Sequence, residues 1–207
     1  MMNFYIDGQI NAIAEKVQLL SKAKLHPIVV AIDGASGSGK STIAQLLCDK
    51  LQAVIIPLDD FFSINIPDDQ WDTFSVTEKL EKVFDWNRVR TLALEPLRER
   101  LLAKWHSFDF LAGIQQDGTY PLAKDETVRY PADIVLLEGA YSSSPFLADL
   151  IDAAVLIDVP AAERHKRLLL RDGPVFSAQW RQRWDTAEAY YFEYIRPKES
   201  FDFIING

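Results

Sequence analysis

The stretch from Ile28 to Thr42, IVVAIDGASGSGKST, constrains the fold more than any other part of the chain. Residues 28–32 form an unbroken apolar run rich in β-branched side chains, which is typical of a parallel strand buried on both faces. A helical pattern of apolar residues follows at residues 43–51. A buried strand that leads through a glycine-rich turn into a helix predicts the first unit of an open α/β sheet.

The turn between strand and helix fills the phosphate-loop pattern G-x-x-x-x-G-K-[ST] at residues 34–41. Its three glycines permit backbone dihedrals that aim successive N–H groups at one anion. Lys40 would add a charge at the β- and γ-phosphates, and the helix that begins near it would turn its positive end toward them. A glycine- and serine-rich turn without a ligand is the alternative, but the strand and helix on either side favour nucleotide binding. The predicted nucleotide-binding residues are Gly34, Ala35, Ser36, Gly37, Ser38, Gly39, Lys40, Ser41 and Thr42.

The rest of the chain repeats the alternation of strand and helix. Apolar runs that suit buried strands lie at residues 53–58, 132–139, 153–159 and 201–205. Helical spacing of apolar residues occurs at residues 3–24, 88–105, 161–171 and 177–195. Pro96 should bend the second of these helices or mark its true start. The alternation predicts an α/β fold with a three-layer, doubly wound parallel sheet. Together with the phosphate-loop pattern at residues 34–41, it suits the phosphate-loop nucleoside triphosphate hydrolase fold.

We expect a single domain over residues 1–207, because a chain of this length suffices for one well-buried core. Three parts of it depart from regular alternation. A polar segment with prolines and scattered aromatics, at about residues 61–86, is expected to cover a substrate. Short strands and a hairpin-like turn predict an insertion at about residues 108–130. The helix at about residues 161–173 is expected to act as a lid.

Composition excludes several classes of partner. A net charge of −8 argues against a large nucleic-acid surface, which needs a basic footprint. No apolar stretch reaches membrane-spanning length, and the N-terminal residues lack the order of a signal peptide, so we expect no membrane contact and a cytoplasmic protein. Cys48 is the single cysteine, which excludes an internal disulfide. The oligomeric state stays open, with a homodimer as one outcome.

Carboxylates stand at the ends of two predicted strands. The carboxyl ends of parallel strands are where ligands bind in open α/β sheets. Glu138 is therefore a candidate to hold Mg²⁺ together with the Ser41 hydroxyl, although it could instead bond nearby backbone. Asp59 is the candidate base for an acceptor hydroxyl. If the strand continues through Asp60, alternation sends the two carboxylates to opposite faces, and we favour Asp59 while leaving Asp60 open.

Three arginines share one face of the predicted lid helix. Arg164, Arg167 and Arg171 are spaced at i, i+3 and i+7. On a mobile helix they could reach the phosphates, and we assign Arg167 and Arg171, with Lys40, to stabilising the transferred group. A solvated basic face is the alternative. The glycine and proline at residues 173–174 would let the segment hinge, which favours the lid.

Seven segments in order resemble the uridine kinase and pantothenate kinase branch of the phosphate-loop kinases. They read IVVAIDGASGSGKST, PLDDFF, DWNRV, FDF, VLLEGAY, ERHKRLLLRD and RPKESFDFIING, and together they span most of the chain. The resemblance implies a nucleoside- or nucleotide-kinase-like fold, ATP as co-substrate and Asp59 as the catalytic base. It also implies substrate contacts for Asp59, Phe61, Asn87 and Arg164.

The same comparison shows departures at the acceptor. Asn87 stands where uridine kinases carry an aspartate for the ribose hydroxyls, and it can bond a hydroxyl without charge. Phe108 replaces a tyrosine of the family, and no histidine near Gly113 matches the one that reads the pyrimidine. The resemblance therefore carries over the fold and the phosphate donor better than the acceptor.

We predict an ATP-dependent phosphotransferase that moves the γ-phosphate to an alcohol group of a small molecule, with a uridine- or cytidine-like nucleoside first. Pantothenate, a sugar or another small alcohol is the alternative acceptor. A different class is a nucleotide-binding ATPase without kinase activity, but the internal arginine row makes a partner-supplied arginine unnecessary. A GTPase switch is disfavoured because none of the asparagines is followed by lysine.

Overall fold

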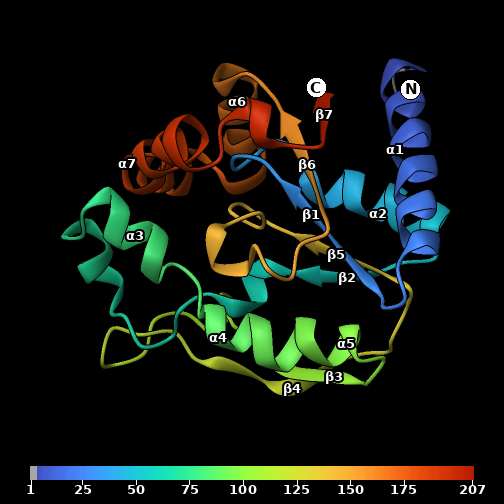
Figure 1. Cartoon of the computed structure of the whole chain (residues 1–207). Coiled ribbons are helices and arrows are strands. Elements are labelled where there is room, and N and C mark those ends of the chain that lie inside the picture. The colour runs from blue at the N-terminus through green and yellow to red at the C-terminus, as the bar shows by residue number, and fades with distance from the viewer. Residues whose placement is uncertain (1–3) are drawn as a thin grey trace.

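A five-stranded parallel sheet forms the centre of the computed structural model, which describes residues 4–207 (Figure 1). Its strand order is β2-β5-β1-β6-β7, and every neighbouring pair is parallel. The strands are β1 (Ile28–Asp33), β2 (Val54–Pro57), β5 (Ile134–Glu138), β6 (Ala153–Asp158) and β7 (Phe203–Asn206). The phosphate-loop strand β1 lies in the middle, and the predicted α/β sheet is confirmed.

Helices cover both faces of this sheet, which makes three layers (Figure 1). On one face α1 (Phe4–Ala23) and α2 (Lys40–Leu51) pack on the inward side chains of β1, such as Ile32. Val29, which points to the opposite face, packs in the core under α7 (Pro174–Tyr190). Alternate β1 side chains thus enter two different cores, which is why the strand reads as continuously apolar. Asn3, where we expected the first helix to begin, lies outside the described residues.

A second, antiparallel sheet lies in the region where an insertion was predicted, at about residues 108–130, and begins earlier than that prediction. The hairpin of β3 (Ala103–Phe108) and β4 (Leu122–Arg129) packs on the outside of the helical stretch that precedes it (Figure 1). The remaining elements are η1 (Leu58–Phe61), η2 (Asp68–Asp72), α3 (Val76–Lys82), α4 (Trp86–Arg88), η3 (Val89–Leu94), α5 (Glu95–Arg98), η4 (Pro145–Leu147), α6 (Ala161–Asp172), η5 (Tyr191–Ile195) and η6 (Lys198–Ser200).

The helix predicted for residues 88–105 is shorter and lies earlier than expected. It runs from α4 through the π-helical η3 to the end of α5. The prediction counted Leu101 and Leu102 as core residues, but their exposed fractions are 55% and 39%. Trp105 belongs to β3, whose burial alternates along the strand. Pro96 follows the wide π turn near the end of the helix, since a proline ring does not fit the regular α-helical ladder.

The strand predicted for residues 53–58 is shorter than expected and stops before the two aspartates that follow it. β2 ends at Pro57, and Asp59 and Asp60 lie in the 3₁₀ helix η1. Proline has no N–H to continue a strand ladder. The alternation of strand side chains is therefore the wrong reason for separating the two carboxylates, although the structure does separate them, as described below.

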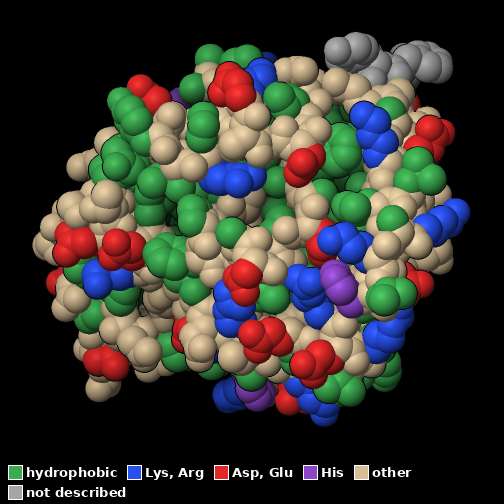
Figure 2. Space-filling model, viewed as in Figure 1, with side chains coloured by type: hydrophobic (Ala, Val, Ile, Leu, Met, Phe, Trp, Pro, Cys, Tyr) green, Lys and Arg blue, Asp and Glu red, His purple; other side chains and the backbone are tan. Residues whose placement is uncertain are grey.

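No helix among residues 4–207 combines the length and the apolarity that a membrane span requires. On the face shown in Figure 2, hydrophobic side chains gather over α7, whereas charged side chains of both signs are mixed over the β3–β4 hairpin and the helical stretch beside it.

Candidate active site

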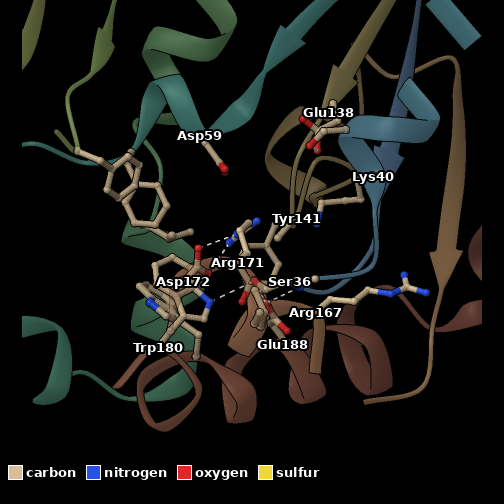
Figure 3. Close-up of a pocket in the computed structure, with 18 of the residues that line it drawn as sticks. Ser36, Lys40, Asp59, Glu138, Tyr141, Arg167, Arg171, Asp172, Trp180 and Glu188 are labelled. Carbon is tan, nitrogen blue, oxygen red and sulfur yellow. Dashed lines mark hydrogen bonds and ion pairs between the residues drawn. The ribbon is translucent and has the colours of Figure 1, made fainter. Parts of the chain in front are cut away.

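A cavity of about 620 Å³ lies where the phosphate loop, the carboxyl ends of β2 and β5, the predicted lid helix α6 and the helix α7 meet (Figure 3). Parallel strands bring their carboxyl ends to one edge of a sheet, so residues distant in sequence converge there. The cavity brings together most of the predicted site: Ser36, Gly37, Gly39, Lys40, Ser41, Thr42, Asp59, Glu138, Arg167 and Arg171. Gly34, Ala35 and Ser38 complete the loop behind this lining.

Glycine is required in the phosphate loop for backbone shape and for close approach. Gly37 and Gly39 have φ angles of 80° and 92°, in the left-handed region that favours glycine. A Cβ atom on Gly37 would lie 2.7 Å from the carbonyl oxygen of Arg164 in the lid helix. Lys40, 9% exposed, donates from Nζ to the carbonyl oxygen of Ala35 at 3.2 Å. Its ammonium group thus lies across the loop, where it could exchange this carbonyl for phosphate.

Asp33 anchors the start of the loop. Its buried carboxylate accepts hydrogen bonds from the N–H of Gly34 at 2.7 Å, of Tyr141 at 2.9 Å and of Ser143 at 3.0 Å. The hydroxyls of Ser143 and Tyr191 donate to it at 2.6 and 2.9 Å. Five donors compensate the buried charge and tie the loop to the turn after β5. The sequence signal for this role was only an aspartate at the end of an apolar run.

Glu138 and Ser41 meet at the base of the cavity. The Ser41 hydroxyl donates to Glu138 Oε1 at 3.2 Å. Burial raises the pKa of the Glu138 carboxyl, the charge of Lys40 opposes this rise, and Asp59 adds to it. A hydroxyl and a carboxylate are suitable first ligands for Mg²⁺, whose other ligands usually come from phosphate and water. Among the described residues there is no cluster of three or more His, Cys, Asp or Glu side chains that could hold a metal without such help.

Asp59 extends into the cavity from η1 (Figure 3). The side chain is exposed to the cavity, and the protein around that cavity desolvates it and so raises its pKa. Lys40 opposes the rise, Asp60 adds to it and Arg171 opposes it. Within residues 4–207 the structure gives the Asp59 carboxylate no hydrogen-bond partner. The carboxylate is therefore available to accept a hydrogen bond from a bound molecule.

Asp60 points away from the cavity. Its Oδ2 accepts a hydrogen bond from Trp105 Nε1 at 2.8 Å, in the hairpin behind η1. One residue in a 3₁₀ helix turns the side chain by about a third of a circle, which separates the neighbouring carboxylates. Gly139 allows η1 to approach β5, since a Cβ atom there would lie 2.6 Å from Leu58 Cβ.

The lid arginines occupy different positions. Arg171 extends into the middle of the cavity, where its guanidinium pairs with both carboxylate oxygens of Asp172, at 2.7 and 2.9 Å (Figure 3). Arg167 donates to the carbonyl oxygen of Ser38 at 3.2 Å and to Glu163 at 3.1 Å. Its guanidinium points away from Asp59 in Figure 3. The structure therefore brings Arg171 nearer to the proposed base than Arg167.

Three of the predicted substrate contacts do not line the cavity. Phe61 is fully buried and packs against Trp105, with ring centroids 5.2 Å apart. Asn87 is exposed on α4. Arg164 lies behind the loop, where it donates to the carbonyl oxygen of Ser36 at 3.0 Å. The positions of these three side chains give no support to their expected contacts with an acceptor.

Aromatic side chains that the sequence did not identify form one wall of the cavity. They are Phe62, Phe84, Phe110, Tyr120, Phe176, Trp180 and Trp184. Phe176 and Trp180 stack with ring centroids 5.9 Å apart, and Phe62 meets Trp184 edge to face at 6.0 Å. We call these seven residues the aromatic wall. The sequence predicted the aromatic-rich helix at residues 177–195, but it did not indicate that the indoles of this helix face the loop.

Three further lining residues also escaped the sequence reading. Asp172 pairs with Arg171, and Glu188 on α7 is bonded to the loop. Tyr141 adopts φ 67°, which is uncommon outside glycine, and its buried hydroxyl has no hydrogen-bond partner among the described residues. The cationic side chains that line the cavity, Lys40, Arg167 and Arg171, all come from the loop and the lid.

Comparisons of the sequence with known proteins point to one family. The model of the family described as Phosphoribulokinase / Uridine kinase matches residues 29–205. A uridine kinase of Borrelia turicatae is 28% identical over 184 residues, covering 86% of this chain and 85% of its own. A uridine kinase of Lactobacillus johnsonii is 28% identical over 194 residues, covering 87% and 86%.

Solved structures share the fold. A possible uridine kinase from Bacillus stearothermophilus superposes with a TM-score of 0.69 at 17% identity, covering 96% of this chain and 98% of its own. D-glycerate 3-kinase from Cryptococcus neoformans gives a TM-score of 0.62 at 15% identity and 95% coverage of both chains. At such identities the likeness extends to the fold alone.

Proposed function

The chain belongs to the phosphoribulokinase / uridine kinase family, and from that premise we propose that its cavity transfers the γ-phosphate of ATP to an uncharged alcohol, with uridine or cytidine first. Family membership makes it an ATP-dependent phosphotransferase with an alcohol acceptor. The identity of the acceptor, the bound metal and the roles of individual residues are the substance of the proposal.

One observation carries the residue roles: Lys40, Asp59 and Glu138 reach a single cavity from three different elements. The loop N–H groups and Lys40 would hold the β- and γ-phosphates, and Arg171 would stabilise charge on the phosphoryl group during transfer. Asp59 would accept the proton of the acceptor hydroxyl as its oxygen attacks phosphorus. Ser41 and Glu138 would hold Mg²⁺, which when bound offsets negative charge on the phosphates.

The character of the acceptor follows from the walls around Asp59. The aromatic wall offers flat apolar surfaces, and the cations of the cavity belong to the phosphate loop and the lid. Of the cations that line the cavity among residues 4–207, Lys40 and Arg171 are assigned above to the phosphates of ATP and Arg167 is bonded to Ser38 and Glu163, which leaves none for a phosphate or carboxylate of the acceptor. A planar group without negative charge therefore fits best, because aromatic faces favour stacking and an unpaired anion costs desolvation energy. The curated relatives named uridine kinase support a nucleoside of this kind.

A panel of alcohols tests the proposal through acceptor-dependent release of ADP with Mg²⁺ and ATP. Uridine and cytidine represent uncharged nucleosides, ribose and fructose uncharged sugars, and pantothenate and ribulose 5-phosphate anionic acceptors. We expect turnover with a nucleoside and at least tenfold lower kcat/KM with either anion. A tenfold difference corresponds to about 1.4 kcal/mol of transition-state stabilisation. Faster turnover of an anionic acceptor would refute the proposed acceptor class.

Two wider expectations belong to the same proposal. A cytoplasmic location suits an enzyme that consumes ATP. The homodimer left open by the sequence stays a prediction, to be checked by light scattering of the purified protein.

A further inference from the structure

Helix α7 is bonded directly to the phosphate loop through Ser36 (Figure 3). The backbone N–H of Ser36 donates to Glu188 Oε1 at 2.9 Å, and the Ser36 hydroxyl donates to the same oxygen. Trp180 Nε1 donates to the Ser36 hydroxyl at 3.2 Å. One residue of the nucleotide-binding loop thus holds two side chains that line the acceptor side of the cavity.

The charge of Glu188 is compensated where it meets the loop. Glu188 is 3% exposed, and its second oxygen lies 3.3 Å from Arg164 Nη1. The same Arg164 nitrogen donates to the carbonyl oxygen of Ser36. Lid helix, loop and α7 therefore form one closed set of bonds, and removing either charge would leave the other buried without its partner.

Glu188 lies on the helical face that forms part of the aromatic wall. Trp180, Trp184 and Glu188 are spaced by four residues, and all three line the cavity. Residues at this spacing lie above one another on one side of a helix. Glu188, which is bonded to the loop, thus shares one helical face with both indoles.

A neighbouring part of the α7 surface is bonded to the segment at about residues 61–86. Arg183 pairs with Asp68 at 2.8 Å and with Asp72 at 2.9 Å, both in η2. Hence α7 is the element that joins the nucleotide side of the cavity to the segment expected to cover the acceptor.

We propose that Glu188 is a positioning residue that couples nucleotide binding at the phosphate loop to the order of the aromatic wall. The inference rests on the proposed function for the identity of the two ligands. A nucleotide that orders the loop also orders Ser36, and through Glu188 it orders α7. The acceptor then binds an aromatic wall that is already ordered, so its binding costs less conformational entropy. The two ligands therefore bind with positive cooperativity. Linkage requires that the acceptor tighten nucleotide binding by the same factor.

Hydrogen exchange of the full chain, with and without Mg²⁺ and a non-hydrolysable ATP analogue, tests the coupling without any acceptor. In the wild type we expect slower exchange in the loop at residues 34–42 and in α7. In Glu188→Ala the loop keeps its protection and α7 loses it. Glu188→Gln, whose amide oxygen can still accept from Ser36, should recover part of the α7 protection.

Asp185→Asn is the matched control. Asp185 also faces the lid helix, with its Oδ2 3.1 Å from His165 Nε2, but within residues 4–207 it makes no hydrogen bond or ion pair with the loop. This variant should keep nucleotide-induced protection in both segments. Should Glu188→Ala fail to fold, Ser36→Ala removes the hydroxyl alone and should reduce α7 protection.

The outcomes separate the inference from the proposed function. Loop protection without α7 protection in the wild type, or full α7 protection in Glu188→Ala or Ser36→Ala, overturns the coupling. Lack of loop protection in the wild type overturns nucleotide binding itself. With a turned-over acceptor in hand, the wild type should bind the analogue about fivefold or more tightly in its presence, and Glu188→Ala should show no such gain.

Discussion

Replacing Asp59 by asparagine should remove the proposed general base while preserving the shape of the cavity. A positioned base contributes about 10²–10⁴-fold to rate. Desolvation by the protein around the cavity raises the pKa of Asp59, which makes its carboxylate a better proton acceptor near neutral pH than a fully solvated aspartate, although Lys40 and Arg171 oppose the rise. We therefore expect kcat to fall about 10³-fold, which corresponds to about 4 kcal/mol of transition-state stabilisation. Binding of an ATP analogue should be unchanged or tighter, because a negative charge near the phosphates is removed.

The assay measures kcat by ADP release at saturating ATP and acceptor, and analogue affinity by calorimetry. Asp60→Asn is the matched control, since Asp60 faces Trp105 and its amide oxygen could still accept from the indole. Its kcat should stay within about threefold of the wild type, the scale of a change in one neutral hydrogen bond. An Asp59→Asn enzyme with more than a tenth of the wild-type kcat, or a larger loss in Asp60→Asn, would refute the reasoning.

Three further predictions follow from the same geometry. Because the base must be ionised and desolvation raises its pKa above the ordinary 3.8, kcat/KM should fall on the acid side at a pH above that value, and a profile of Asp59→Asn should lack this limb. Arg171→Ala should lower kcat by about 10³-fold or more, as expected for an arginine on the transferred phosphoryl group, whereas Lys166→Ala on the exposed side of the same helix should leave it unchanged; equal effects would argue against Arg171. Tyr191→Phe removes one donor to the buried Asp33 carboxylate and should lower the free energy of unfolding in urea by about 1.5–3 kcal/mol, and an unchanged midpoint would count against the anchor.

The sequence predicted the parts of the site that local pattern and parallel-sheet geometry determine. The amino-acid pattern at residues 34–41 is enough to identify the phosphate loop. Glu138 was identified by its position at the end of an apolar run. Asp59 reaches the cavity as expected, but through a 3₁₀ helix and not through strand alternation. Proline at the end of β2 was the local signal that this strand stops earlier.

The rest of the site depends on contacts between distant segments. Phe62, Phe110 and Trp180 meet only after the covering segment, the hairpin and α7 have packed together. Glu188 and Ser36 are 152 residues apart, and nothing near Glu188 in the sequence marks it as a partner of the loop. Periodicity failed in the same way at Trp105, where apolar residues of a turn and a strand imitated the continuation of a helix.

The fate of the γ-phosphate tests the central claim most directly. With ATP labelled at that phosphate, Mg²⁺ and uridine, the account predicts that the label appears in a stable ester on the nucleoside, in amounts equal to the ADP formed. Label that appears instead as inorganic phosphate, at a rate that no alcohol in the panel alters, would contradict it.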